Sequence, residues 1–207
     1  MRFVLKSQIK AWNREYRLRG RLWRGERRDR NIVEPYLSGS LILDDGCGDG
    51  KGSPKKSGVV SIDFSIHALR LNPSNLKIVG DMTSLPFRNS TFDVVLLTHS
   101  IDHLMEEGRR TALSEASRVL IPGGFMIIRV FSRLDFRFSK GKEVEEGTFV
   151  RGNGILTHYF NPDEIAPSLG MTFEKREKID YYINIQGHKY LREEYIIIFK
   201  KLKSENS

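Results

Sequence analysis

The stretch that decides the fold runs from Leu41 to Gly52 and reads LILDDGCGDGKG. Its first three residues are apolar, which predicts a short buried strand, and two carboxylates, Asp44 and Asp45, follow directly. Glycines stand at positions 46, 48, 50 and 52, and glycine adopts a positive φ without steric cost and lets a ligand lie against the backbone. Ligands of open α/β sheets bind where such strands end. The stretch therefore predicts a nucleotide-like ligand at the end of a strand.

The spacing of the glycines distinguishes between ligand classes. A dinucleotide fingerprint, G-x-G-x-x-G, needs its third glycine at position 51, where this chain has lysine. The pattern observed is an acid followed by three glycines at alternate positions. A nicotinamide oxidoreductase is therefore the less favoured interpretation.

Composition is that of one ordinary globular domain. The chain has 207 residues, 39% of them hydrophobic and 29% charged. No apolar run approaches the length that spans a bilayer, and charge interrupts the first residues, so we predict neither a membrane segment nor a signal peptide. A single cysteine, Cys47, excludes an internal disulfide. We expect a cytoplasmic protein that does not associate with membranes.

The basic charge is concentrated at the N-terminus. Residues 1–30 hold eleven Lys or Arg and three acids, which accounts for the whole formal net charge of +8. We predict a basic helical arm over residues 1–37 and one domain over residues 38–207. The arm has two interpretations: it contacts a polyanion such as RNA, or it is a solvated helix whose arginine stems cover the edge of the sheet.

Apolar segments alternate with short crossovers or helices along the domain, which predicts a parallel sheet. The strands are expected at residues 41–44, 59–63, 76–79, 92–98 and 125–130, with the clearest helix at 106–120. Residues 132–157 are predicted to be an irregular segment that acts as a lid or contacts substrate. A helix is predicted to begin with Asn161 as its N-cap. Two β-rich runs, 173–185 and 195–202, are expected to pair as an antiparallel edge.

Five segments, taken in order, resemble the successive motifs of the class I S-adenosylmethionine-dependent methyltransferases of the type 11 group. They are residues 44–50, 61–65, 80–87, 92–95 and 118–124. The resemblance implies an α/β fold with a Rossmann-like, seven-stranded, mostly parallel sheet, helices on both faces and an antiparallel last strand. It also implies S-adenosyl-L-methionine as cofactor and an enzyme that moves its methyl group to an acceptor.

This resemblance supplies a role for each strand end. Asp44 would meet the ammonium group of the cofactor, and Asp63 would accept both ribose hydroxyls, which suits the two oxygens of a carboxylate. The remaining cofactor-binding predictions are Gly46, Cys47, Gly48, Gly50, Phe64, Asp81, Met82 and His99. Asp45 departs from the family, since its position is usually apolar. An unpaired buried carboxylate is costly, so we expect Asp45 to face the ligand or a basic neighbour.

No general base stands out. The candidates are His99, Asp102 and His103, and an acceptor that is already a good nucleophile needs only to be aligned with the methyl group. His99 and His103 lie four residues apart, but no further ligand cluster accompanies them, so we predict no metal site.

A second resemblance is to the wobble-uridine tRNA methyltransferases. It rests on residues 46–51, 102–104 with Arg109 and Arg110, and 157–160. It implies a carboxymethyl-uridine acceptor and a small zinc-binding activator subunit as partner. The acceptor therefore stays open between a small molecule and a tRNA nucleoside. The alternative is a catalytically silent methyltransferase-fold protein that binds a ligand or partners another subunit.

Overall fold

A seven-stranded sheet forms the centre of the computed structural model, which describes residues 2–22, 28–38, 41–166 and 170–203. The strand order is β3-β2-β1-β4-β5-β10-β9. The strands are β1 (Ile42–Asp45), β2 (Val59–Asp63), β3 (Leu76–Val79), β4 (Phe92–Thr98), β5 (Leu120–Phe131), β9 (Met171–Ile185) and β10 (His188–Lys201). The first five are parallel, and β10 runs antiparallel to both of its neighbours. The predicted mostly parallel sheet with an antiparallel last strand is confirmed.

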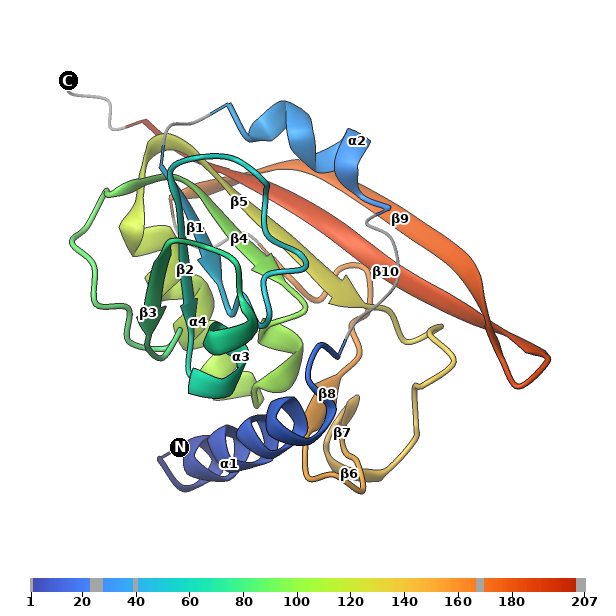
Figure 1. The fold of residues 1–207 in the computed structure, drawn as a ribbon. Coiled ribbons are helices and arrows are strands. Elements are labelled where there is room, and N and C mark those ends of the chain that lie inside the picture. The colour runs from blue at the N-terminus through green and yellow to red at the C-terminus, as the bar shows by residue number, and fades with distance from the viewer. Residues whose placement is uncertain (1, 23–27, 39–40, 167–169, 204–207) are drawn as a thin grey trace.

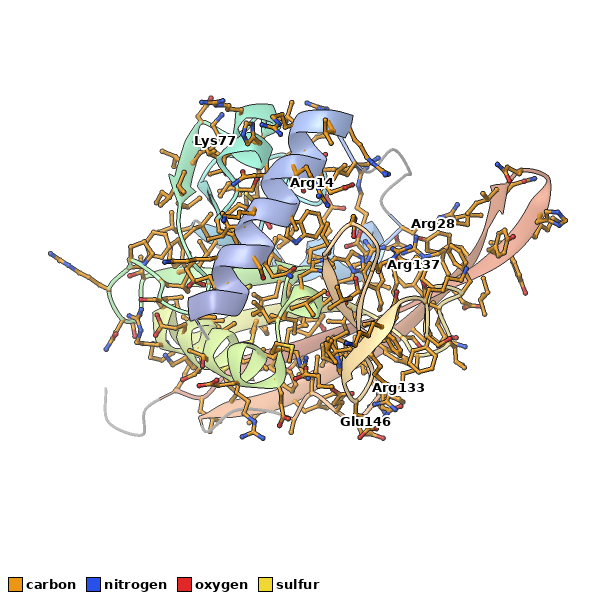
Figure 2. The ribbon with its side chains drawn as sticks, turned by 90° about the horizontal axis from the view of Figure 1, so that it is seen from below. Arg14, Arg28, Lys77, Arg133, Arg137 and Glu146 are labelled. Atoms are coloured by element: carbon orange, nitrogen blue, oxygen red, sulfur yellow. The ribbon has the colours of Figure 1, made fainter. Side chains whose placement is uncertain are left out.

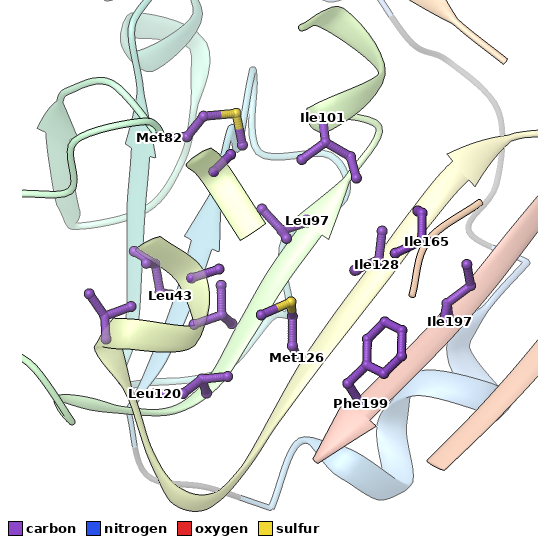
Figure 3. Packing of buried hydrophobic residues seen from close by; sticks show 14 of the residues in the cluster. Leu43, Met82, Leu97, Ile101, Leu120, Met126, Ile128, Ile165, Ile197 and Phe199 are labelled. Carbon is purple, nitrogen blue, oxygen red and sulfur yellow. The ribbon is translucent and has the colours of Figure 1, made fainter. Parts of the chain in front are cut away.

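The central strands of the sheet are buried on both faces, which is why most of their residues are apolar. Figure 3 shows Leu43, Leu97, Ile128 and Ile197, from four neighbouring strands, in the larger core cluster. The helix α4 (Glu106–Val119) covers this cluster through its small residues Ala112 and Ala116. The short helices α2 (Arg30–Val33) and η1 (Glu34–Tyr36) lie against the other face.

The order of strands reverses between β1 and β4, and ligands bind at the carboxyl ends of strands beside such a switch point. The connection from β1 to β2 contains no helix, as the short spacing predicts, and α3 (Ile66–Leu71) and η2 (Ile101–His103) follow β2 and β4. Within the predicted arm of residues 1–37, α2 and η1 thus cover a sheet face, whereas the helix α1 (Arg2–Arg19) does not. α1 crosses beneath the strand ends, between α3 and a second, smaller sheet (Figure 1).

Hydrogen bonds tie α1 to the parts on either side of it. Asn13 accepts one from the Ser65 hydroxyl, 2.8 Å away at the start of α3. On the other side, the Gln8 amide donates to the Gly154 carbonyl over 3.0 Å and accepts from the Leu156 N–H over 3.1 Å. The helix therefore closes the end of the domain where the strands of the main sheet terminate.

The prediction of an irregular segment at 132–157 is confirmed for residues 132–141 and wrong for the residues that follow. Residues 142–158 form an antiparallel sheet of β6 (Lys142–Glu145), β7 (Thr148–Val150) and β8 (Leu156–His158). Lys142, Glu143 and Glu146 are exposed on this small sheet, while Phe149 packs with Phe131 and Tyr159 in a separate cluster. A contact with β5 and with residues beyond β8 thus stabilises strands that are too short to be recognised locally.

The helix predicted to start at Asn161 is also not found over residues 161–166. Its capping contact is present, because the Asn161 N–H donates to Glu164 over 3.1 Å. The other oxygen of Glu164, however, pairs with the buried His158, and the chain forms only a turn. The N-terminal arm also differs from the prediction: α1 ends at Arg19, before Gly20 at φ 65°, and the next helix among the described residues begins at Arg30. No helix of the described chain is long and apolar enough to cross a membrane.

Candidate functional site

Hydrogen bonds attach the glycine loop after β1 to the end of β2. The backbone N–H groups of Gly46 and Cys47 donate to the Ile62 carbonyl over 2.9 and 3.0 Å. Gly46 has φ 76°, and a Cβ added to it would lie 2.3 Å from Cβ of Ser100 in the turn after β4. Glycine is therefore required at position 46 by backbone conformation and by space.

Asp63, the last residue of β2, also binds this loop, through its side chain. Its Oδ2 accepts the Gly48 N–H over 2.9 Å, and its Oδ1 accepts the Ser65 N–H over 2.7 Å. Burial raises the pKa of Asp63 to about 6, although both hydrogen bonds favour the ionised form. Asp63 is thus a carboxyl group at the C-terminal end of β2 with a pKa of about 6.

Two adjoining cavities open at these strand ends. A small cavity of about 60 Å³ and a large cavity of about 530 Å³ share walls made by the loop, α1 and η2. The shared lining residues are Trp12, Tyr16, Gly46, Gly48, His99 and His103. On α1 the rings of Trp12 and Tyr16 stack with centroids 5.7 Å apart, and Tyr16 Oη lies 2.6 Å from where a Cβ of Gly48 would be. The arm thus supplies an aromatic wall that faces the glycine loop.

Most of the predicted cofactor-binding residues meet at these cavities. Asp63, Phe64 and Met82 line the small one, Asp44 and Cys47 line the large one, and Gly46, Gly48 and His99 line both. Asp44 also accepts a hydrogen bond from the Ser53 hydroxyl. Gly50 and Asp81 line neither cavity: Gly50 packs against Asn72, and Asp81 accepts the Thr83 N–H over 2.9 Å.

His99, one of the three candidate bases, is held by buried contacts. The residue has φ 51°, and its ring stacks on Phe131 with centroids 4.0 Å apart. Nε2 lies 3.2 Å from Glu194, Nδ1 lies 4.0 Å from Asp102, and both nitrogens are buried, so the exposed part of the ring is carbon. Burial lowers the pKa of His99, which outweighs the opposite effect of Glu194. His99 therefore presents a ring surface to the cavities.

His103 presents different chemistry. Its Nδ1 lies 2.6 Å from the Leu156 carbonyl, and since a carbonyl only accepts, Nδ1 carries the proton and Nε2 the lone pair. Within the described ranges, Nε2 has no hydrogen-bond partner. Burial lowers the pKa of His103 to about 4, and the ring packs edge-on against Trp12. This is an unprotonated nitrogen base beside both cavities.

Asp102, the third candidate base, is fully buried and lines neither cavity. Its Oδ1 accepts the Phe131 N–H over 2.8 Å, and burial raises the pKa of this carboxyl to about 8. The contact ties η2 to the end of β5 and so positions His99 and His103 on either side.

A buried ionic network supports the far wall of the large cavity. Arg129 on β5 contacts Glu194 at 2.6 Å and Asp29 at 3.3 Å, and Glu194 also meets Arg192 at 3.3 Å. His99 and the two arginines hold the pKa of Glu194 well below its usual range, although burial opposes them. Arg129 lines the large cavity together with Arg137 and Arg151. Three arginines thus form part of the wall of the large cavity.

Sequence reasoning missed the arginines of the cavity wall, their partner Glu194 and the stacking of Trp12 on Tyr16. These residues come from α1, β5, β10 and the segment between β5 and β8, with no spacing that marks them as a group. The sequence offers one local indication of these contacts, the spacing of four residues that places Trp12 and Tyr16 on one face of a helix. Among the residues that the structure describes, no three His, Cys, Asp or Glu side chains group as metal ligands.

Comparison with known proteins finds similarity to methyltransferases in the part of the chain that forms this site. Residues 43–128 match the methyltransferase domain family. The tRNA N(3)-cytidine methyltransferase METTL2 of Gallus gallus is 27% identical over 147 residues, which are 60% of this chain and 40% of that protein. The tRNA (carboxymethyluridine(34)-5-O)-methyltransferase of Arabidopsis thaliana is 34% identical over 106 residues, 49% of this chain and 26% of that protein. The chain thus spans less than half the length of these curated relatives.

Solved structures extend the likeness to the whole fold. The 1,6-didemethyltoxoflavin-N1-methyltransferase of Burkholderia thailandensis, with 1,6-didemethyltoxoflavin and S-adenosylhomocysteine bound, superimposes with a TM-score of 0.62 at 17% identity. The match covers 96% of this chain and 89% of that one. The resemblance to class I methyltransferases that the five sequence segments predict is confirmed.

The ionic network generates a prediction about stability. Glu194→Gln keeps the shape of the side chain but leaves two buried arginines short of an anion, and we expect a loss of about 3 kcal/mol in the free energy of unfolding. Glu177, whose partner Lys175 is 43% exposed, is the matched control, and Glu177→Gln is expected to cost about 0.5 kcal/mol or less. Urea denaturation measures both. Equal losses in the two variants would contradict a structural role for the network.

Proposed function

We propose that this protein is an S-adenosylmethionine-dependent methyltransferase that acts on a nucleoside of an RNA. The observation that carries the first part is the glycine loop clasped by Asp63 beside a cavity at the switch point, within the segment that matches the methyltransferase domain family. A fold by itself does not establish activity, so the proposal is argued from the site.

The residues present fit the cofactor. Gly46 and Gly48 leave the backbone open to both cavities, and a Cβ at either position would meet Ser100 or Tyr16. Asp63 offers carboxylate oxygens to the ribose hydroxyls, Phe64 and Met82 flank the place of the adenine, and Asp44 offers a counter-charge to the ammonium group. When bound, S-adenosylmethionine supplies an electrophilic methyl group whose bond to sulfur breaks as the bond to the acceptor forms.

In such a transfer the protein would align the acceptor with the methyl group. Where the reacting atom of the acceptor carries a proton, the protein would also remove that proton. The stacked rings of Trp12 and Tyr16 and the face of His99 would limit where an acceptor can lie, which is the main contribution that positioning makes. His103 Nε2 is the group best placed to take a proton, because its tautomer is set by Leu156 and burial keeps the ring neutral.

An RNA acceptor is supported by charge and by relatives. The two curated relatives named above are tRNA methyltransferases. The exposed face of α1 carries Lys6, Lys10, Arg14 and Arg17, and another face of the same helix lines the large cavity. Figure 2 looks onto this side of the molecule, with α1 in front and Arg14 and Arg137 labelled. Phosphates flanking a nucleoside in the large cavity would meet these cations. The activator subunit implied by the wobble-uridine resemblance stays a prediction.

Binding of S-adenosylhomocysteine tests the cofactor site. Calorimetry should show binding that Asp63→Ala weakens at least about tenfold, while Asp180→Ala, on the exposed side of β9, leaves it unchanged. Asp63 must be ionised to accept both hydroxyls, and its pKa is raised to about 6, so affinity should be constant above pH 7 and fall as the pH drops through 6. Absent binding, or binding indifferent to Asp63, would refute the cofactor site.

Methyl transfer from labelled cofactor into fractionated cell extract tests the acceptor. We expect the label in RNA. Replacing the four basic residues of α1 named above by glutamine should weaken RNA binding and reduce its salt dependence. The matched control carries four glutamines on the β9–β10 hairpin, at Lys175, Arg176, Lys178 and Lys189. Label confined to small metabolites, with RNA affinity unaffected by the arm, would contradict the RNA proposal. Cofactor binding with no transfer to any fraction would favour a catalytically silent protein.

His103→Asn tests proton removal. The asparagine amide can still donate to Leu156 as Nδ1 does, but Nε2 is gone, so turnover should fall about 10²- to 10⁴-fold with S-adenosylhomocysteine affinity retained. His188→Asn, at the exposed start of β10, is the control. Full turnover in His103→Asn would mean that the acceptor reacts without a base at this position.

A further inference from the structure

Asp45 is a buried carboxyl that makes no hydrogen bond within the described part of the chain. It is the last residue of β1, only 1% exposed, and neither oxygen has a partner. Its side chain lines the small cavity, whose other walls include Asp63, Phe64 and Met82. The expectation of a basic neighbour is not met, and the alternative, that Asp45 faces a ligand, agrees with its place.

The surroundings of Asp45 favour its neutral form. Burial raises the pKa of this carboxyl well above its usual range. The charged groups that act on it are Asp44 on the same strand, Asp63 on β2, Asp81 after β3 and Glu115 on α4, and every one of them is an acid that raises the pKa further. A neutral carboxyl has an O–H donor as well as an acceptor, which an ionised one lacks.

A second group at the same cavity is also unsatisfied. Ser100 lines the small cavity, is 8% exposed, and its hydroxyl has no partner among the described residues. Buried polar groups in folded proteins are nearly always hydrogen-bonded, and leaving one unpaired costs free energy. Two such groups at one cavity indicate that a polar ligand completes them.

We propose that Asp45, as a neutral carboxyl, donates a hydrogen bond to a ring nitrogen of the adenine of the bound cofactor. The inference rests on the proposed function, since Asp63, Phe64 and Met82 make the small cavity the place of the adenosine. Adenine offers ring nitrogens as acceptors, and an ionised carboxylate has no proton to give them. Asp45 is thus a positioning residue for the cofactor.

Calorimetry with S-adenosylhomocysteine tests Asp45 directly. Asp45→Ala, which removes the polar atoms without filling the cavity, should bind about tenfold more weakly than the unmodified protein. Asp45→Asn, whose amide still donates, should bind within about threefold. The unliganded alanine variant should melt no lower than the unmodified protein, because the carboxyl it loses is buried without a hydrogen bond in the described part of the chain. A purely structural role would lower that melting temperature and leave affinity unchanged.

Analogues of the ligand identify the partner atom. The 1-, 3- and 7-deaza forms of S-adenosylhomocysteine each replace one ring nitrogen by carbon. The unmodified protein should bind one of them about tenfold more weakly than the parent ligand, and Asp45→Ala should bind that analogue and the parent equally well. If the Asp45→Ala or the Asp45→Asn variant does not fold, binding of the three analogues to the unmodified protein still tests the proposal.

Two results would overturn the inference. One is unchanged affinity of Asp45→Ala for S-adenosylhomocysteine, and the other is equal affinity of the unmodified protein for all three deaza analogues. If Asp63→Ala weakens binding and Asp45→Ala does not, only the role of Asp45 fails. If the unmodified protein does not bind S-adenosylhomocysteine at all, the proposed function itself fails.

Discussion

The site depends on one set of hydrogen bonds, those that attach the glycine loop to the end of β2. The Ile62 carbonyl receives two loop N–H groups, and Asp63 receives a third from Gly48. With no helix between β1 and β2, these bonds rather than a helix dipole fix the loop. They bring Gly46 against Ser100 and Gly48 against Tyr16, and both cavities are bounded by the resulting surface.

The lining of the large cavity carries charges of both signs. Its acids are Asp44 of β1, Asp49 of the glycine loop and Glu15 of α1, and Arg129, Arg137 and Arg151 form part of its wall. Arg129 is balanced by Glu194 and Asp29, but Arg151 has no ion-pair partner within the described residues. An acceptor that carries negative charge would be drawn toward this wall, and α1 brings further cations to its rim.

The parts of the site that could be predicted from the sequence are those within one local pattern. The loop glycines and Asp63 are recognisable because a strand, a turn and an acid follow one another within a few residues. Trp12, Arg129 and Glu194 were not predictable, because they reach the site only after α1, β5 and β10 have packed. The same holds for β6 to β8, whose short strands need Phe131 and Tyr159 to bury Phe149, and for Glu164, whose pairing with His158 competes with a helix.

The sequence by itself determined the parallel sheet, its antiparallel last strand and the strand ends at which a ligand would lie, since the period of apolar residues and the turn glycines are local properties. The tertiary structure alone decided the state of each titratable group. Asp63, Asp45 and Asp102 are the same residue type, yet Asp63 accepts loop hydrogen bonds, Asp45 faces a cavity unpaired, and Asp102 holds η2 to β5. Burial and neighbouring charge, which set their pKa values, exist only once distant segments are packed together.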